Sequence, residues 1–253
     1  MIIAMIAVFA SGAYALDNIG DIHINDANGA PVHPYAIGDT VNIQGIITAE
    51  FTTATITTYS RAFIQDATGG INIYKYASSP DPDHICFLVG DNVSIGGHIE
   101  QYNGMVEVII WNCTINSHGN PVPAPKVLTV SDMINTFDPL TYREPNEGRL
   151  IRINQVTITG TGTWSSKNWM ITDDAAVSDT LYVYGGSGCA VHPLIGTPLP
   201  VGYFDVIGVL SQFDASVPRT AGYQISPRGP ADIIAPPTEV LPSSWGKVKA
   251  MYR

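Results

Sequence analysis

Residues 61–74 read Arg-Ala-Phe-Ile-Gln-Asp-Ala-Thr-Gly-Gly-Ile-Asn-Ile-Tyr, which predicts two strands joined by a tight turn. Residues 62–65 favour strand structure, and residues 71–74 alternate apolar and polar side chains. Between these runs, Asp66 can accept hydrogen bonds from backbone N–H groups, and the two glycines tolerate a positive φ. This hairpin predicts a fold built from short, turn-connected strands.

A weaker copy of the hairpin returns about 110 residues later. Residues 168–173 (Asn-Trp-Met-Ile-Thr-Asp) and 181–184 (Leu-Tyr-Val-Tyr) form this copy, in which a longer connection replaces the Thr-Gly-Gly turn. The paired positions are Gly38 with Gly148, Ile43 with Ile153, Asp66 with Asp173, Tyr74 with Tyr184, and 95–97 with 206–208. Such a repeat predicts two copies of one five-strand unit rather than one large sandwich.

Five short strands, with glycines that allow the first and fourth to bend, can close into a small barrel without exposed edges. We therefore predict an all-β fold of two tandem five-stranded OB-fold barrels, barrel 1 in residues 16–120 and barrel 2 in residues 147–235. Tyr102-Asn103-Gly104 predicts a two-residue hairpin turn between the fourth and fifth strands of barrel 1. Residues 121–146 are predicted to be a linker that holds a short helix over 127–137, with Ser131 as its N-cap.

Several segments also resemble a known family. They are GDTVNIQGIITAE (38–50), RAFIQDATGGINIY (61–74), GDNVSIGGHIEQYNGMVEV (90–108), YFDVIGVLSQFD (203–214) and GYQISPRGPADI (222–233). Over about residues 21–234 the chain resembles the tandem OB-fold modules of secreted bacterial proteins. Such modules often sit beside extracellular nuclease, phosphatase or lamin-tail-like domains, and the resemblance implies single-stranded nucleic acid as the ligand.

An OB-fold binds its ligand on the face of the second and third strands, between the 1–2 and 4–5 loops. If Ile71 and Ile73 face the core, the alternate side chains point outward and offer tyrosine rings on which bases or sugars stack. The candidate ligand-binding residues are Arg61, Phe63, Asn72, Tyr74, Tyr76, Tyr102, Asn103, Tyr182 and Tyr184. In the alternative interpretation, these tyrosines simply favour strands and pack under loops or against the other barrel.

The formal net charge of −10 argues against strong nonspecific binding to nucleic acid, although a local basic groove remains compatible with it. The expected ligand is single-stranded nucleic acid or an oligosaccharide. The alternatives are a cell-surface structural or adhesion component that contacts proteins, and an accessory module of an extracellular nuclease system.

Catalysis, cofactors and metals are not expected from sequence motifs. The histidines are scattered without metal-ligand spacing, and no nucleophile-elbow motif occurs. The acidic pairs at 81/83 and 173/174 are interpreted as solvated turn residues, with Ca²⁺ binding as the alternative.

Residues 1–15 are apolar and end in Ala-Tyr-Ala, which predicts a cleaved signal peptide and a secreted or cell-surface protein without stable membrane insertion. An N-terminal anchor is the alternative, but this segment is shorter than the roughly 20 residues that span a bilayer. Residues 236–253 read as a Pro-rich linker and a basic amphipathic tail, a candidate site for protein partners or a helix that lies on barrel 2.

The chain holds three cysteines, an odd number that allows one disulfide in a secreted protein. Cys86 and Cys113 both belong to the first repeat and are the expected pair. Three buried, unpaired thiols are the alternative.

Overall fold

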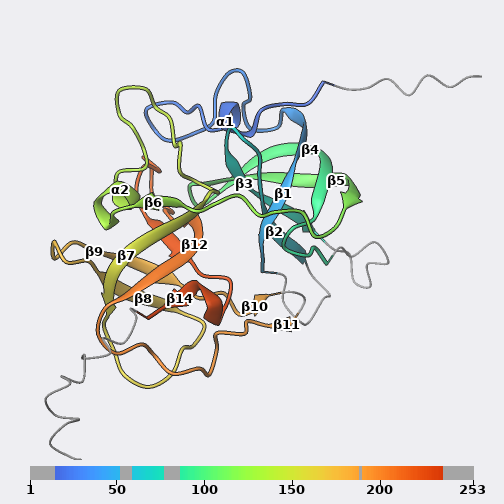
Figure 1. Ribbon diagram of the computed structural model, residues 1–253. Coiled ribbons are helices and arrows are strands. Elements are labelled where there is room, and N and C mark those ends of the chain that lie inside the picture. Colours follow the sequence, from blue (N-terminus) through green and yellow to red (C-terminus); the bar gives the residue numbers. More distant parts are fainter. Residues whose placement is uncertain (1–14, 52–58, 77–85, 188–189, 236–253) are drawn as a thin grey trace, which may run out of the picture.

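The computed structural model describes residues 15–51, 59–76, 86–187 and 190–235, which form two β-barrels (Figure 1). The strands of barrel 1 are β1 (Thr40–Glu50), β2 (Tyr59–Gln65), β3 (Gly70–Tyr76), β4 (Asn92–Tyr102) and β5 (Met105–Ser117). They close in the order β1-β2-β3-β5-β4. Neighbouring strands are antiparallel, except for β3 and β5, which are parallel.

Barrel 2 repeats this topology. Its strands are β7 (Leu150–Ile158), β8 (Asn168–Thr172), β9 (Ser178–Tyr182), β12 (Phe204–Gln212) and β13 (Tyr223–Ser226). They follow the order β7-β8-β9-β13-β12, and pairing of β12 with β7 closes the ring. The β9–β13 pair is parallel, as β3–β5 is in barrel 1. Two five-stranded barrels with this shared order are OB-folds, and the predicted fold class is confirmed.

The internal repeat also holds residue by residue. Ile43 pairs with Ile95 in barrel 1, and Ile153 pairs with Val206 in barrel 2. Asp66 Oδ1 accepts from the backbone N of Thr68 and of Gly69, both at 2.7 Å. Asp173 Oδ1 accepts from the N of Ala175 at 3.1 Å and of Val177 at 2.9 Å. The two aspartates therefore organise equivalent turns, although the second one is longer.

Residues 121–146 do more than link the barrels. Within them, β6 (Lys126–Leu128) pairs in parallel with β7 and extends the sheet of barrel 2, and α2 (Val130–Ile134) follows. The helix is shorter than predicted and Ser131 is not its cap. Thr129 is the N-cap, because its hydroxyl accepts from the N of Asp132 at 3.0 Å while the Asp132 carboxylate accepts from the N of Thr129 at 2.9 Å.

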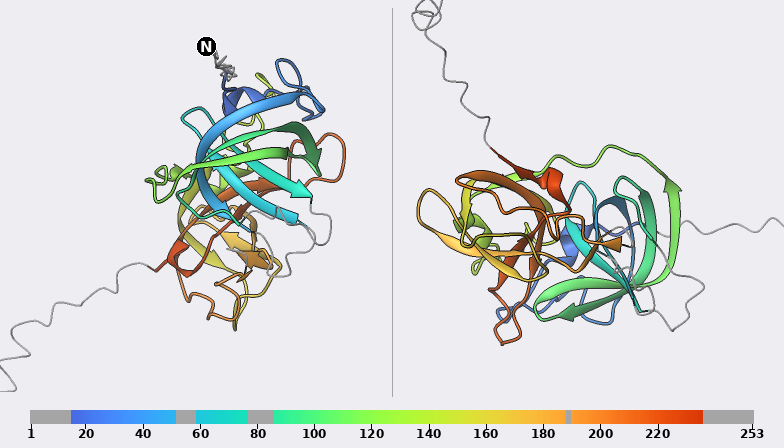
Figure 2. Two further views of the ribbon diagram at one scale, coloured as in Figure 1. Left: turned by 90° about the vertical axis from the view of Figure 1, so that its right-hand side faces the viewer. Right: turned by 90° about the horizontal axis from the view of Figure 1, so that it is seen from below.

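The remaining elements are short. They are α1 (Ile19–Ile22), β10 (Gly186–Ser187), β11 (Ala190–Val191), η1 (Pro230–Asp232) and β14 (Ile233–Ile234). The segment 15–39 that holds α1 lies against barrel 1, where Ile19 and Ile22 are fully buried in its core. In the turned views of Figure 2, the strands of barrel 1 (blue to green) and of barrel 2 (yellow to red) form adjacent bundles.

A third apolar core joins the barrels. It contains residues from both barrels and is distinct from the core inside each one: Ala49, Phe51, Phe63, Met105, Leu150, Tyr184 and Val209. Hydrogen bonds cross the same junction, from the N of Leu150 to Gln65 Oε1 at 3.0 Å and from Arg219 Nη1 to Gln101 Oε1 at 3.0 Å. Burying each large apolar side chain contributes about 1.5–3 kcal/mol, so this core holds the barrels in a defined arrangement.

The prediction of a disulfide between Cys86 and Cys113 is wrong. Cys86 is disulfide-bonded, whereas Cys113 on β5 is a free thiol, and burial raises its pKa to about 11. Cys113 packs against the core of barrel 1 instead. The third cysteine, Cys189, lies outside the described residues.

The predicted signal peptide, apart from residue 15, lies outside the described residues, as do the acidic pair 81/83 and the C-terminal tail 236–253. In the part of the chain that the structure describes, no helix has the length and apolar character needed to cross a membrane.

Candidate functional site

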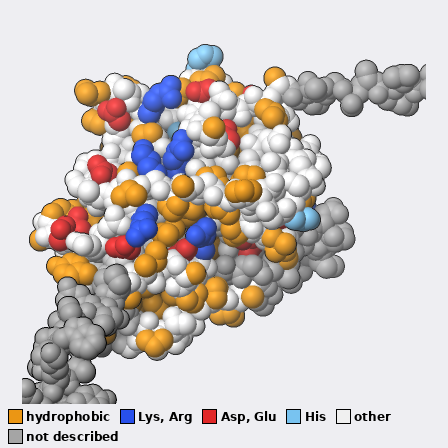
Figure 3. All heavy atoms as spheres, in the orientation of Figure 1, with side chains coloured by type: hydrophobic (Ala, Val, Ile, Leu, Met, Phe, Trp, Pro, Cys, Tyr) orange, Lys and Arg blue, Asp and Glu red, His pale blue; other side chains and the backbone are white. Residues whose placement is uncertain are grey.

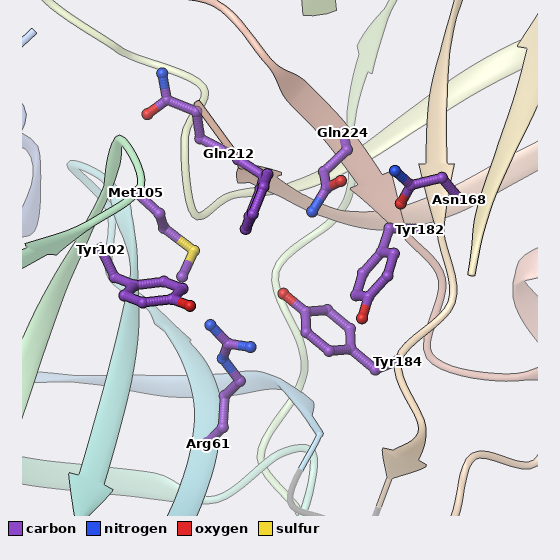
Figure 4. Close-up of a pocket in the computed structure, with 9 residues that line it drawn as sticks. Arg61, Tyr102, Met105, Asn168, Tyr182, Tyr184, Gln212 and Gln224 are labelled. Carbon is purple, nitrogen blue, oxygen red and sulfur yellow. The ribbon is translucent and has the colours of Figure 1, made fainter. Parts of the chain in front are cut away.

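A pocket of about 370 Å³ opens at the junction of the barrels. Its described lining residues come from both barrels: Arg61, Tyr102 and Met105 from barrel 1, and Asn168, Tyr182, Tyr184, Gln212, Phe213 and Gln224 from barrel 2. Figure 4 shows Arg61 pointing into the space between Tyr102 and Tyr184. The site therefore exists only because two barrels face each other.

The guanidinium group of Arg61 is held by aromatic rings. Its carbon lies 4.9 Å from the ring centroid of Tyr184, in barrel 2, and 6.0 Å from that of Tyr74, its cross-strand partner on β3. Tyr184 in turn stacks on Phe51 of the junction core, with ring centroids 4.4 Å apart. Cation–π contact thus holds the positive charge of Arg61 at the junction of the two barrels.

A second hollow, of about 300 Å³, adjoins the first. Its described lining residues are Arg61, Tyr74, Tyr76, Tyr102 and Glu107. The two hollows share Arg61 and Tyr102, so together they form one surface, which we call the tyrosine groove. Tyr76 and Tyr102 are 61% and 56% exposed, so both residues are accessible to a planar ligand.

Glu107 on β5 is the carboxylate of this groove. It is buried, and burial raises its pKa to about 7, while the nearby Arg61 charge lowers it and Glu100 raises it further. The carboxyl of Glu107 therefore changes its charge near neutral pH, next to the cation of the groove.

Replacing Glu107 by Gln is expected to stabilise the protein above neutral pH. A pKa raised from 4.5 to about 7 corresponds to about 3 kcal/mol of stability that is present below pH 4.5 and lost as the pH rises through 7. Glu107→Gln removes that loss, so the variant and the wild type should differ by about 3 kcal/mol at pH 8.5 and by little at pH 4. Urea unfolding at both pH values measures the difference.

Glu100→Gln is the matched control, because the Glu100 side chain is 41% exposed. It should change the pH dependence of stability far less than Glu107→Gln does, because Glu100 is the smallest of the three influences on the pKa of Glu107. Parallel stability curves for Glu107→Gln and the wild type would contradict the role given to Glu107.

The structure places six of the nine predicted ligand-binding residues around the groove: Arg61, Tyr74, Tyr76, Tyr102, Tyr182 and Tyr184. As predicted, Ile71, Ile73, Leu181 and Val183 are fully buried in the two barrel cores. The tyrosines on the outer face differ from one another. Tyr76 is exposed, as a ring that stacks on a ligand must be, whereas Tyr184 is only 8% exposed and packs at the junction of the barrels, as the alternative interpretation predicted.

Phe63, Asn72 and Asn103 do not belong to the groove lining. Phe63 is fully buried in the junction core, and Asn72, opposite it on β3, is 1% exposed and donates from Nδ2 to the Ala62 carbonyl at 3.0 Å. The expectation that Asn72 is accessible was wrong, because the outer face of β2 and β3 is partly covered at the barrel junction. Asn103 shapes the β4–β5 turn with φ 48°, and its carbonyl accepts from the N of Asp214 at 2.6 Å.

Sequence reasoning missed five lining residues: Met105, Asn168, Gln212, Phe213 and Gln224. Except for Met105, these belong to barrel 2. Asn168 begins its second strand, β8, whereas Gln212, Phe213 and Gln224 lie outside the two strands that were expected to carry the ligand face. The repeat did signal Gln212 and Phe213, since Gln212-Phe213-Asp214 matches the turn at Gln101-Tyr102-Asn103. No sequence pattern shows that this turn lies beside Arg61 of the other barrel.

Comparison with known proteins gives one informative sequence match. No family model matches the chain. Over 217 residues, 84% of the chain, it is 30% identical to a protein of Bacillus subtilis (strain 168) named endonuclease YhcR. The chain spans 16% of that protein's length.

Solved structures give weaker likenesses. The second OB-fold domain of replication protein A from Methanococcus maripaludis is 18% identical at TM-score 0.26, covering 34% of this chain and 91% of that one. The S. pombe Stn1–Ten1 complex is 18% identical at TM-score 0.31, covering 38% of this chain and 74% of that one. Asparaginyl-tRNA synthetase from Pyrococcus horikoshii is 14% identical at TM-score 0.28, covering 35% of this chain and 21% of that one. Since these TM-scores are below 0.5, the fold assignment rests on the strand order.

Proposed function

We propose that this chain is a non-catalytic binding module that holds single-stranded nucleic acid in the tyrosine groove. One observation carries the proposal. Among the described residues that line the larger pocket, Arg61 is the charged side chain and tyrosine rings and carboxamides surround it, without a carboxylate. A pocket in which one cation is surrounded by aromatic rings suits a strand of stacked bases and phosphates.

The chemistry of each group matches one part of a nucleotide. The exposed rings of Tyr76 and Tyr102 offer faces for stacking, at about 1–3 kcal/mol per base. Arg61, held against the ring of Tyr184, places a positive charge in the pocket, and a phosphate carries the complementary charge. The carboxamides of Gln212 and Gln224 present both donors and acceptors to the edge of a base.

Charge over the whole protein limits this binding to local contacts. The net charge of −10 repels a polyanion at long range. Lys and Arg side chains nevertheless gather in a band over the face shown in Figure 3. We therefore expect binding of modest affinity that weakens with salt, with a slope of log K against log[salt] of about −0.7 for each phosphate contacted.

The named relative supports nucleic acid as the ligand class, because an endonuclease acts on nucleic acid. It does not extend cleavage to this chain, since the match spans 16% of that protein. In the larger pocket, the described lining also lacks the histidine, carboxylate or cysteine that acid–base or nucleophilic cleavage would use. A binding role within a nuclease system is the form of the proposal that agrees with both observations.

We place this activity outside the cell or at its surface. The apolar segment 1–15, which ends in Ala-Tyr-Ala, has the form of a signal peptide. Cys86 is disulfide-bonded, and structural disulfides persist mainly in oxidising compartments. Both observations support secretion.

Tyr102→Ala is expected to lower the affinity for a labelled single-stranded oligonucleotide about tenfold or more, because its ring lines both hollows. Tyr76→Ala should have a similar effect. Tyr203→Ala is the matched control, since Tyr203 is 51% exposed and lies outside the groove lining. Fluorescence anisotropy at several salt concentrations measures all three variants.

A panel of neutral oligosaccharides runs beside the oligonucleotides. Binding to glycans with no response to oligonucleotides would assign the groove to sugars instead. An absence of binding to both panels would favour a structural or adhesion role through protein contacts. Equal affinities of the Tyr102→Ala variant and the wild type would contradict the site.

A further inference from the structure

A buried cluster of His23, Glu144 and Glu147 lies where the N-terminal segment, the linker and both barrels meet. One ring nitrogen of His23 and one carboxylate oxygen of each glutamate lie within 4.8 Å of one another. The three side chains are 2% exposed or less. The cluster lies outside the groove linings, so the proposed binding function leaves it unexplained.

The His23 ring is oriented with a free lone pair. Its Nε2 lies 2.7 Å from the carbonyl oxygen of Gly70, so Nε2 carries the proton and donates. Nδ1 then holds the lone pair, and this atom is buried without a hydrogen-bond partner. A histidine that ligates a metal has this arrangement, with one nitrogen donating to a carbonyl and the other facing the ion.

Both carboxylates are also oriented by hydrogen bonds from other segments. Glu144 accepts from Asn25 Nδ2 at 2.5 Å and from the Tyr223 hydroxyl of β13. Glu147 Oε1 accepts from the N of Val106 on β5 at 2.8 Å, while Glu147 Oε2 is buried without a partner. The cluster thus holds two unpartnered ligand atoms, one on His23 and one on Glu147, inside a frame of fixed donors.

Two adjacent buried carboxylates need a compensating positive charge or a proton. Glu144 is 0% and Glu147 1% exposed, and the two carboxyl groups lie within hydrogen-bond reach of each other. The nearby Arg149 directs its guanidinium elsewhere, to the carbonyl oxygens of Pro145 and Thr68. A divalent cation would neutralise both carboxylates and occupy the unpartnered nitrogen.

We propose that His23, Glu144 and Glu147 form a binding site for a divalent transition-metal ion, with Zn²⁺ as the probe that fits the donor set. One imidazole nitrogen and two carboxylate oxygens suit Zn²⁺, which binds such atoms at about 2.0–2.2 Å. Ligand atoms around a tetrahedral Zn²⁺ are about 3.4 Å apart, so small side-chain rotations close the cluster around the ion. A hollow of about 170 Å³, lined in part by His23 and Glu144, gives access and room for a water ligand.

The ion would act as a clamp between the barrels. Its ligands come from the N-terminal segment (His23), the linker (Glu144) and the start of barrel 2 (Glu147). The hydrogen-bond partners of the glutamates, Val106 and Tyr223, belong to barrels 1 and 2. Binding of the ion would therefore stabilise the barrel arrangement on which the tyrosine groove depends, although none of the three residues that hold the ion lines the groove.

The test compares the full chain with Glu147→Gln, which keeps an oxygen for the N of Val106 and removes the carboxylate. Metal analysis after dialysis against Zn²⁺ should give one tightly held ion per wild-type chain and none at this site in the variant. At free Zn²⁺ of about one hundred times Kd, the wild-type Tm should rise by about 5–10 °C, and that of the variant should not respond. In EDTA the variant should be at least as stable as the wild type, because it lacks one buried carboxylate.

His98→Asn is the matched control, since His98 and Glu100 form a partly exposed pair on β4, with Nε2 and Oε1 3.1 Å apart. This control should keep the tightly held ion. If Glu147→Gln does not fold, His23→Asn takes its place in the same comparison. Absence of stoichiometric Zn²⁺ from the wild type, or its loss in His98→Asn but not in Glu147→Gln, would overturn the proposal and leave a carboxyl pair that shares a proton.

Discussion

Gly148→Ala is expected to destabilise the protein by about 4 kcal/mol, whereas Gly38→Ala at the equivalent position of barrel 1 should cost about 1 kcal/mol. Both glycines precede the first strand of their barrel and have positive φ values, 73° for Gly148 and 92° for Gly38. An alanine at either position therefore carries the same kind of backbone strain.

The positions differ in what surrounds them. A Cβ on Gly148 would overlap the carbonyl group of Gly70, at the start of β3 in the other barrel, while a Cβ on Gly38 meets no atom within 4 Å. The methyl group on Gly148 can be accommodated only if the barrels separate, and this movement would open the apolar junction core. The loss of stability in Gly38→Ala thus gives the cost of the positive φ alone. The additional loss in Gly148→Ala gives the cost of placing a methyl group where the two barrels meet.

Urea unfolding of both variants measures the two free energies. Oligonucleotide affinity gives a second readout, which should fall in Gly148→Ala and remain at the wild-type level in Gly38→Ala. Equal losses of stability in the two variants would show that the barrels tolerate a methyl group between them.

Phe51→Ala is expected to lower the free energy of unfolding by about 4 kcal/mol, because the substitution leaves a cavity. Phe51 is 1% exposed, stacks on Tyr184 with centroids 4.4 Å apart, and meets Phe63 edge-on at 6.0 Å. Its removal also takes away the support of the ring that holds Arg61. We therefore expect the variant to lose both stability and oligonucleotide binding.

Phe87→Ala is the control for this variant. Phe87 is also 1% exposed but belongs to the core of barrel 1, so it should cost a similar free energy without loosening the junction. Hydrogen exchange separates the two, because the N–H of Leu150 donates across the junction to Gln65. In Phe51→Ala, but not in Phe87→Ala, the amide hydrogen of Leu150 should exchange faster relative to that of Ile153. The same Leu150-to-Ile153 ratio of exchange rates in both variants would contradict a separate junction core.

Residues close together in the chain carried most of the predictions that proved correct. Asp66 and the glycines after it specify a tight turn because side-chain acceptors and positive φ act over a few residues. Asn103 and Gly104 specify the β4–β5 hairpin for the same reason, with φ values of 48° and 92°. The helix cap was misassigned within this range, since Thr129 and Asp132 satisfy two N–H groups that Ser131 does not.

The candidate site was predicted in part. The period of two along β3 and β9 correctly separated core residues from outer ones. It does not report what covers the outer face, so Phe63 and Asn72 were expected to be accessible and are buried. Cys113 shows the same limit, because membership of one repeat does not bring two sulfur atoms together.

The sequence by itself determined two OB-fold barrels, their strand periodicity and their turns, because alternation, turn chemistry and an internal repeat are properties of neighbouring or regularly spaced residues. Only the tertiary structure decided that the barrels face each other, that Arg61 and Tyr184 share one groove, and that His23 meets Glu144 and Glu147. These contacts join residues more than a hundred positions apart. They depend on how two finished barrels pack, and no local pattern encodes that packing.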